Sequence, residues 1–229
     1  MRRAFLLLAL TACDRSAAGT GPAVTIELPK LTSGTANPPA PNVIVTIDSV
    51  VVSNRVMATI ANGALADTGK LEVLKDEITP PLVFAFDKRT TGATVIAVLD
   101  TMVMPGEDLM MLGLVTGEPS SQTIEFRVTG TAPGALETNL SPNLELHHEE
   151  AVLTAKDGTD KRLGLKAADP IDESVTLTMA VSRYKSAHGD ATDDTLTLTL
   201  YPDATAADLI MAVESTREQY PHLVIVAPG

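Results

Sequence analysis

The side chains best suited to bind a metal ion lie together in the run His147-His148-Glu149-Glu150. Imidazole nitrogens and carboxylate oxygens are ligands that many divalent metals accept. The residues before the run alternate between apolar and polar side chains, which predicts a β-strand, and neighbouring residues of a strand point to opposite faces. The two imidazoles therefore do not converge on one ion. We interpret the run as a solvated strand edge and predict no metal site.

Motifs of catalytic and cofactor-binding sites are missing from the sequence. It has no G-x-S-x-G nucleophile elbow, no phosphate-binding loop that ends in Gly-Lys-Ser/Thr, and no H-E-x-x-H zinc motif. Four methionines, at positions 102, 104, 110 and 111, could bind a soft metal, but their apolar neighbours favour core packing. The acidic run at residues 169–173 lacks the alternating ligand spacing of a calcium loop. We therefore predict a protein that is not an enzyme and needs no cofactor.

The N-terminal residues have the layout of a secretory signal, because Met1-Arg2-Arg3 is basic and residues 4–10 are apolar. The next segment, Leu10-Thr11-Ala12-Cys13, resembles the lipobox of bacterial lipoproteins, whose cysteine is lipidated and becomes the mature N-terminus. The resemblance implies a signal peptide at residues 1–12, a lipid anchor on Cys13 and a flexible tether at residues 13–22. A membrane-spanning helix is the alternative, but it needs about twenty apolar residues and this run is far shorter.

The composition restricts the partners and the core. The chain has 229 residues and a formal net charge of −12, which becomes −14 once Arg2 and Arg3 leave with the signal peptide. Such an acidic surface is repelled by phosphate groups, so we predict no nucleic-acid binding, and membrane attachment must come from acyl chains. Cys13 is the sole cysteine and aromatic residues make up 3%, so an aliphatic core without disulfides must stabilise the fold.

The chain repeats itself after roughly a hundred residues, which is typical of two copies of one domain. Thr25-Ile26-Glu27 recurs as Thr123-Ile124-Glu125, and Pro41-Asn42 recurs as Pro142-Asn143 before a strand pattern. Three further pairs follow in the same order: LVFAF with LTLTL, ATVIAVLD with ADLIMAVE, and LMMLGLV with HLVIVAP. We predict one module at residues 23–119 and a diverged second module at residues 120–229. Chance alignment of apolar runs is the alternative.

Each copy contains one strong helix pattern. In the first copy apolar residues recur at i, i+3, i+4 and i+7, which predicts one buried helix face made of Val95, Val98, Leu99 and Met102. Met104-Pro105-Gly106 should end this helix. In the second copy Thr205 and Asp208 form a capping box before a helix that Tyr220-Pro221 should stop.

Strand patterns complete the fold class. Residues 175–182 and 195–200 alternate between apolar residues on one face and mostly threonine or serine on the other, so we predict an antiparallel strand pair joined by a polar loop at residues 183–194. Strands combined with one helix per copy predict an α+β fold. Each of the two tandem modules would have a small mixed sheet with one or two helices packed on one face.

Four segments of the first module, taken in order, resemble the periplasmic domain of the ExbD/TolR family of biopolymer-transport proteins. They are similar to the entry strand with its Leu-Pro-Lys element, the next strand, the Asp-Lys turn with its following helix, and the closing strand. In this chain they are Ile26-Glu27-Leu28-Pro29-Lys30, VIVTID from Val43, Asp87-Lys88 with VIAVLD from Val95, and Gly113-Leu114-Val115-Thr116. The second module keeps the spacing but has Arg127-Val128 and Tyr201-Pro202-Asp203 at the motif positions.

The resemblance implies candidate residues for partner binding. The segment Leu28-Pro29-Lys30 could pair with a strand of another protein by addition to a sheet edge, beside Asp87 and Lys88. An ordinary turn with surface charges is the alternative for Asp87 and Lys88. Family members also carry a transmembrane helix with an aspartate that takes part in proton flow. Residues 1–12 hold no carboxylate, so we do not expect proton-driven motor activity from this chain alone.

Together these patterns predict a non-enzymatic, lipid-anchored protein on the periplasmic side of the cell envelope. It would be an accessory of an ExbB/ExbD- or Tol-type energised transport system and bind protein or peptidoglycan near the membrane. The resemblance implies ExbB/TolQ-like motor-channel proteins and ExbD/TolR-like proteins as partners, and it also allows a homodimer. Asp14 resembles an inner-membrane retention signal, which favours the inner over the outer membrane. A structural envelope lipoprotein with no transport role is the alternative.

Overall fold

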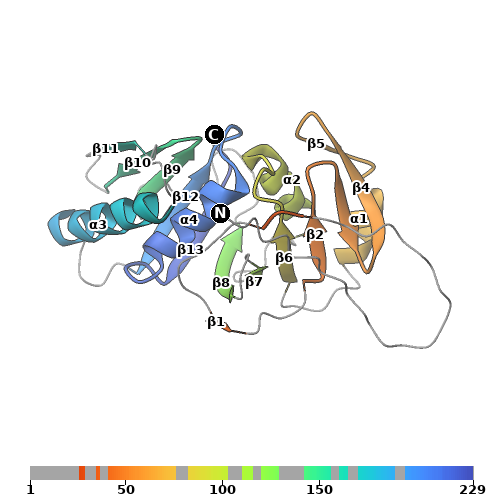
Figure 1. The fold of residues 1–229 in the computed structure, drawn as a ribbon, viewed down its shortest axis with the longest axis horizontal. Coiled ribbons are helices and arrows are strands. Elements are labelled where there is room, and N and C mark those ends of the chain that lie inside the picture. Colours follow the sequence, from red (N-terminus) through yellow and green to blue (C-terminus); the bar gives the residue numbers. More distant parts are fainter. Residues whose placement is uncertain are drawn as a thin grey trace, which may run out of the picture.

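The computed structural model describes residues 26–28, 35–36, 41–75, 82–102, 110–115, 120–128, 142–155, 160–164, 170–188 and 194–228. The chain forms both strands and helices, and the predicted α+β class is confirmed (Figure 1). The helices are α1 (Gly69–Lys75), α2 (Gly92–Met102), α3 (Pro170–His188) and α4 (Ala206–Thr216). The strands of the first part are β1 (Thr35–Ala36), β2 (Val43–Val45), β3 (Ser49–Val52), β4 (Arg55–Ala61), β5 (Ala64–Ala66), β6 (Leu82–Phe86), β7 (Met110–Val115) and β8 (Ser120–Val128). Those of the second part are β9 (Asn143–His147), β10 (Glu150–Thr154), β11 (Asp160–Gly164), β12 (Thr195–Leu200) and β13 (His222–Val226).

The described strands form one 13-stranded sheet with the order β11-β10-β9-β12-β13-β8-β7-β6-β2-β3-β4-β5, and β1 pairs with β8 off this path. Figure 1 shows the sheet crossing the molecule from β11 at the left to β4 and β5 at the right, with α3 and α4 over its left part. Strand β8 lies between β7 and β13, antiparallel to the first and parallel to the second. It therefore connects the strands of the first part of the chain to those of the second.

On either side of β8, five strands follow the same order and the same directions. From the inside outward they are β7-β6-β2-β3-β4 and β13-β12-β9-β10-β11. The inner three are parallel in both runs. The two outer pairings of each run are antiparallel: β2 with β3 and β3 with β4 in the first run, and β9 with β10 and β10 with β11 in the second. The side-chain register also agrees, since Phe84 lies between Val43 and Leu114, and Leu198 lies between Leu144 and Ile225.

The main core forms between one face of the sheet and the four helices. Alternate residues of the strands point into it, as expected for half-buried strands, and so do the apolar faces of α2 and α4. Among the most buried side chains are those of Phe84, Phe86, Leu144 and Leu146 from the sheet and Tyr220 after α4. Aliphatic side chains dominate this core, which accords with the scarcity of aromatic residues in the sequence.

The opposite face of the sheet carries a second, smaller apolar cluster. Its buried members are Val83 and Ala85 of β6 and Leu28 from the N-terminal segment, and Ile26 and Ile44 pack against them. Residues 26–28 therefore lie on the sheet face that points away from the main core. Only the first half of the sheet has such a described covering segment.

The prediction of a strand at residues 175–182 was wrong, because these residues lie within helix α3. Their alternation also fits a helical period, since Leu177, Ala180, Val181 and Tyr184 fall at i, i+3, i+4 and i+7 and are all buried. A helix also includes residues 183–188 of the predicted loop. The other member of the predicted pair does form a strand, β12, but β12 is parallel to both of its neighbours, β9 and β13.

The two predicted helices, α2 and α4, form close to the predicted positions. Helix α2 is described up to Met102, and Met104-Pro105-Gly106 lie outside the described residues. The capping box of α4 is confirmed, since the Thr205 side chain accepts from the Asp208 backbone and the Asp208 side chain accepts from the Thr205 backbone. Helix α4 ends at Thr216, before the predicted stop at Tyr220-Pro221.

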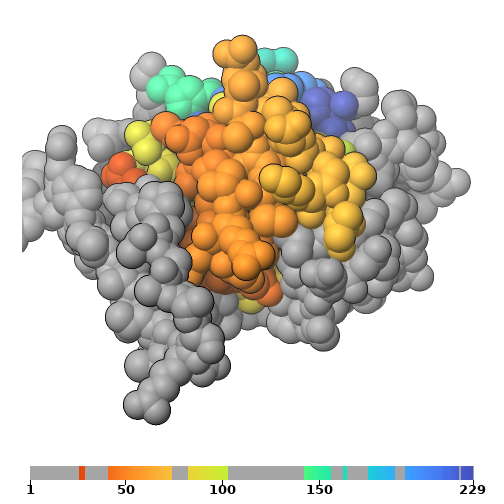
Figure 2. Space-filling model, turned by 90° about the vertical axis from the view of Figure 1, so that its right-hand side faces the viewer, coloured from red at the N-terminus to blue at the C-terminus, as the bar shows by residue number. Residues whose placement is uncertain are grey.

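Figure 2 shows the end of the molecule that is formed by β2 to β5 and α1, in orange. On these elements Val56 and Val73 are 49% and 62% exposed. Single exposed apolar residues of this kind are common on protein surfaces. Within the described part of the chain, no helix is both long and apolar enough to cross a membrane.

Candidate functional site

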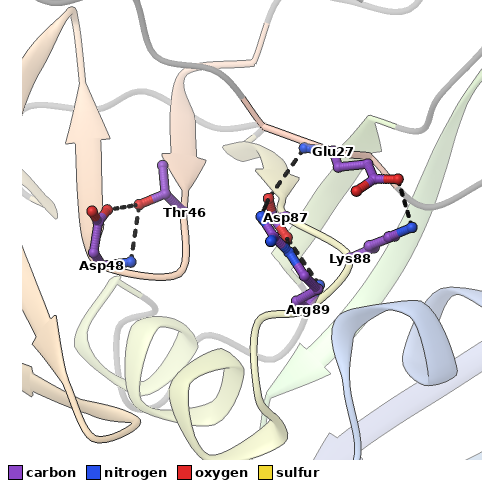
Figure 3. Close-up of polar contacts among 6 residues, drawn as sticks. All are labelled: Glu27, Thr46, Asp48, Asp87, Lys88 and Arg89. Carbon is purple, nitrogen blue, oxygen red and sulfur yellow. Dashed lines mark hydrogen bonds and ion pairs between the residues drawn. The ribbon is translucent and has the colours of Figure 1, made fainter. Parts of the chain in front are cut away.

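Two of the predicted site segments, residues 26–28 and the Asp87-Lys88 turn, meet in space, although about sixty residues separate them in sequence. Asp87 follows β6, and its side chain is only 2% exposed. One carboxylate oxygen, Oδ1, accepts from the Arg89 backbone N at 3.0 Å and from Arg89 Nε at 2.9 Å. The other, Oδ2, accepts from Arg89 Nη2 at 3.0 Å and from the Glu27 backbone N at 3.1 Å (Figure 3). The buried carboxylate thus fixes the N-terminal segment to the end of β6.

The environment of Asp87 keeps its carboxyl group ionised. Burial alone would raise its pKa, but the hydrogen bonds from Arg89 and from the Glu27 backbone outweigh burial, and the pKa falls below the ordinary value of 3.8. The same contact raises the pKa of Arg89, chiefly through the side-chain hydrogen bond to Asp87. Asp87 is therefore a charged structural group that is bonded within its own chain.

Lys88 contacts the same segment through its backbone and its side chain. Its backbone N donates to the Glu27 carbonyl oxygen at 2.8 Å, and its Nζ lies 2.6 Å from Glu27 Oε1. The side chains of Lys88 and Glu27 are 41% and 60% exposed, so water screens the ion pair and its contribution to stability is small. Both main-chain polar groups of Glu27 are thus bonded to the Asp-Lys turn.

Of the other predicted site residues, Leu28 is 8% exposed and packs against Val83 and Ala85. Pro29 and Lys30 lie outside the described residues, and so does Cys13. The structure thus brings Leu28, Asp87 and Lys88 together, and their role in partner binding stays a prediction. Arg89 was missed by sequence reasoning, although a cation two residues after the turn carboxylate Asp87 would have been a usable signal.

The same turn also joins the two halves of the molecule. Gly92 N donates to Ala204 O at 2.7 Å, and Ala206 N donates to Thr90 O at 2.8 Å. Between these bonds Thr91 and Thr205 form an antiparallel bridge. When the two helix patterns are aligned, Gly92 matches Ala206 and Thr90 matches Ala204, so the two hydrogen bonds are reciprocal. We call these contacts of residues 90–92 with residues 204–206 the junction.

Gly92 is required at the junction by the close approach of the other half. A Cβ atom at this position would lie 2.1 Å from Tyr201 O and 3.2 Å from Leu200 Cγ. Gly92 was not predicted from the sequence. The feature that could have indicated it is a glycine at the first position of α2, where α4 has Ala206.

Local hydrogen bonds between polar side chains and the backbone close the turn between β2 and β3 (Figure 3). Thr46 Oγ1 lies 2.5 Å from Asp48 Oδ1 and accepts from the backbone N of Ser49 at 2.9 Å. Hydrogen bonds from the Thr46 and Ser49 side chains lower the pKa of Asp48. These contacts give Asp48 a structural role in the turn.

The histidine-rich run directs its two imidazoles to different carboxylates. His147 Nδ1 lies 3.4 Å from Asp203 Oδ1, whereas His148 Nδ1 lies 3.5 Å from Asp208 Oδ2. The ring of His147 also packs on that of Tyr201, with 3.8 Å between centroids. Burial, together with Glu145 and Asp203, raises the pKa of Tyr201. Among the residues that the structure describes, no group of three or more ligand-capable side chains is arranged to hold a metal ion.

Comparison of this chain with protein-family models, with curated proteins and with solved structures gave no match.

Proposed function

We propose that this chain is a non-enzymatic, lipid-anchored envelope protein built from two tandem ExbD/TolR-like modules, residues 23–119 and 120–229. It assists an ExbB/ExbD- or Tol-type transport system by binding a partner near the membrane. The observation that carries the proposal is the meeting of Glu27, Asp87 and Lys88 at one place. The sequence motifs that resemble the family therefore belong to one structural unit rather than to unrelated segments.

The arrangement of the sheet supports the duplication. Two runs of five strands have the same order, the same directions and the same register. Among the matched sequence pairs, Pro41-Asn42 precedes β2 and Pro142-Asn143 leads into β9. Four of the five repeated pairs fall on matching elements: β2 and β9, β6 and β12, α2 and α4, and β7 and β13. The first pair does not, because Ile26-Glu27 lie outside the strands whereas Thr123-Ile124-Glu125 lie within β8.

The N-terminal sequence supports the anchor and the location. Residues 1–13 have the order of a lipoprotein signal, and Asp14 favours retention at the inner membrane. The expected partners are an ExbB/TolQ-like motor channel, ExbD/TolR-like proteins, or peptidoglycan. The net charge of −12 disfavours nucleic acid.

Site-specific crosslinking in cells tests the proposal. A photo-reactive amino acid in place of Lys88, whose side chain is 41% exposed, should capture a motor-channel subunit. The matched control is the same group in place of Arg183, an exposed residue of α3 on the other half. Reproducible absence of motor subunits from the Lys88 sample would reject the transport role. Conversion of Cys13 to Ser should release the protein from the membrane fraction.

A structural envelope lipoprotein without a transport role is the second candidate. It is favoured by one observation, that Asp87 is buried and bonded to Arg89 and Glu27, so the motif stabilises the fold by itself. Outer-membrane fractionation together with binding to purified peptidoglycan, and no motor partner, would support this candidate over the first.

A further inference from the structure

The turn between β4 and β5 consists of two residues, Asn62 and Gly63, whose φ angles are both positive, at 52° and 76°. Ala61 and Ala64 pair with each other on either side of this turn. A two-residue hairpin turn with left-handed backbone at both positions is the type I′ turn, and Asn-Gly is a sequence that it strongly prefers. Asn62 is also exposed. The structure therefore presents an asparagine amide to water directly before a glycine.

This pair of residues can react with itself. An asparagine that precedes a glycine loses its side-chain amide readily, because glycine has no Cβ to shield its main-chain nitrogen. The Gly63 nitrogen attacks Asn62 Cγ, a bond forms between these atoms, and Nδ2 leaves as ammonia with the proton that the Gly63 nitrogen gives up. Water then opens the cyclic imide. Cleavage of the new N–Cγ bond leaves an aspartate, whereas cleavage of the original peptide bond leaves an isoaspartate, whose main chain runs through Cβ and Cγ.

The same turn is docked on the start of α2. Thr94 Oγ1 donates to Gly63 O at 2.9 Å, and a second hydroxyl, Thr91 Oγ1, lies 3.0 Å from Thr94 Oγ1. The approach is close, since a Cβ atom on Gly63 would lie 3.3 Å from Thr91 Oγ1. Thr91 itself belongs to the junction, through its bridge with Thr205. A change in the main chain of this turn therefore acts beside the contacts between the two halves.

The docked turn resists the reaction. Ring closure takes the main chain at Asn62 out of its type I′ geometry, so the turn must open locally before the amide is lost. The pairing of β4 with β5 and the hydrogen bond from Thr94 both oppose this opening. The pairing is short, because β5 has three residues and stands at the end of the strand order. The Thr94 hydroxyl is the contact that a single substitution can remove.

We propose that Asn62 is a site of deamidation, with water as the co-reactant, and that its isoaspartate product releases the turn from α2. The isoaspartate lengthens the main chain by its Cβ atom, and a two-residue type I′ turn does not accommodate this. Gly63 O then moves away from Thr94, and the junction loses the support of the turn. The inference is independent of lipidation, of partner binding and of transport.

Peptide mass spectrometry of the full chain, kept in mildly alkaline buffer, tests the site without any substitution. Asn54 is the matched control within the chain, because it is an exposed asparagine with a φ of 61° in the two-residue turn between β3 and β4, but arginine follows it. We expect Asn62 to convert at least about tenfold faster than Asn54. Enzymatic methylation of the isoaspartate carboxyl group distinguishes this product from aspartate.

Two substitutions on α2 test the role of Thr94. Thr94→Val removes the hydroxyl that holds Gly63 O and should speed the conversion about fivefold, because the open turn becomes more populated. Thr101→Val is the matched control and should leave the rate unchanged, since Thr101 Oγ1 donates to Ala97 O within the same helix. Should Thr94→Val lose its fold by circular dichroism, Thr94→Ala against Thr101→Ala makes the same comparison.

Urea unfolding of aged samples tests the consequence for the fold. The unaltered chain should lose part of its free energy of unfolding as isoaspartate accumulates at residue 62. Asn62→Gly keeps a sequence that type I′ turns accept but has no amide, so its free energy of unfolding should not change with age.

Three results would overturn the proposal. The first is conversion of Asn62 no faster than that of Asn54 in the unaltered chain. The second is an equal rate of conversion in the folded variants at Thr94 and Thr101. The third is a free energy of unfolding that stays the same in the unaltered chain after isoaspartate has formed.

Discussion

Substitution of Gly92 by Ala tests whether the junction holds the two halves together as described. Gly92 is buried at the start of α2, where the backbone of Tyr201 passes close to it. The new Cβ would lie 2.1 Å from Tyr201 O, whereas ordinary contacts begin at 3.4 Å. Because the neighbour is backbone rather than a flexible side-chain end, the two halves must separate by about 1.3 Å, the difference between those distances.

The decrease in the free energy of unfolding caused by Gly92→Ala can be worked out from the contacts that this separation disturbs. Gly92 N to Ala204 O and Ala206 N to Thr90 O are short hydrogen bonds, each contributing about 0.5–1.5 kcal/mol. Overpacking of a well-packed site costs about 1–3 kcal/mol in addition. Alanine is favoured over glycine in a helix by about 0.5–1 kcal/mol, which offsets part of this. We expect a net loss of about 2–4 kcal/mol in the free energy of unfolding.

Urea unfolding followed by circular dichroism measures the loss, with Gly69→Ala as the matched control. Gly69 is also the first residue of a helix, but a Cβ there meets nothing within 4 Å. Gly69→Ala should therefore be neutral or stabilising by up to about 1 kcal/mol. If the two variants unfold within about 0.5 kcal/mol of each other, the junction does not pack as described.

Four further changes have defined outcomes. Arg89→Met leaves the buried Asp87 carboxylate without its cation and should cost about 1–3 kcal/mol in urea unfolding, an amount reduced by the exposure of Arg89. Because the pKa of Asp87 is lowered in the folded state, its carboxylate stabilises the fold above the unfolded pKa of about 3.9, and this stabilisation is lost as the pH falls through the folded pKa. The free energy of unfolding should therefore fall more steeply with decreasing pH for the unaltered chain than for Asp87→Asn. Thr205→Ala removes the capping box of α4 and should lower the free energy of unfolding, measured in urea, by about 1 kcal/mol. An unchanged free energy of unfolding would contradict the role of the cap. Thr90→Val should be neutral or stabilising by about 1 kcal/mol, because Thr90 Oγ1 is buried with no hydrogen-bond partner within the described part of the chain, and a clear loss would reveal an undetected partner.

The elements with strong local signals could be predicted from the sequence. The apolar face of α2, the capping box of α4 and the strand at β12 depend on residues close together in the chain, so short-range patterns identify them. Helix α3 was mistaken for a strand because hydroxyl and apolar residues alternate at 175–182, and only packing against α4 selects the helical period. Threonine permits both structures, so the pattern alone does not decide.

The candidate site was only partly accessible to sequence reasoning. Leu28, Asp87 and Lys88 were named through the family resemblance. The burial of Asp87, its three hydrogen bonds from Arg89 and the attachment of Glu27 were not, because these contacts depend on where the N-terminal segment crosses the sheet. Neither the sequence around residue 27 nor the sequence around residue 87 predicts by itself that the two segments contact each other.

The sequence by itself determined the fold class, the acidic charge, the apolar face of α2 and the capping box of α4. These properties follow from composition and from short-range periodicity, which each segment carries alone. The tertiary structure alone decided that β8 joins the halves into one sheet, that residues 26–28 lie over β6, and that Gly92 meets the backbone of Tyr201. The physical reason is that these contacts join residues more than fifty positions apart, and they form only when both sides are brought together by folding.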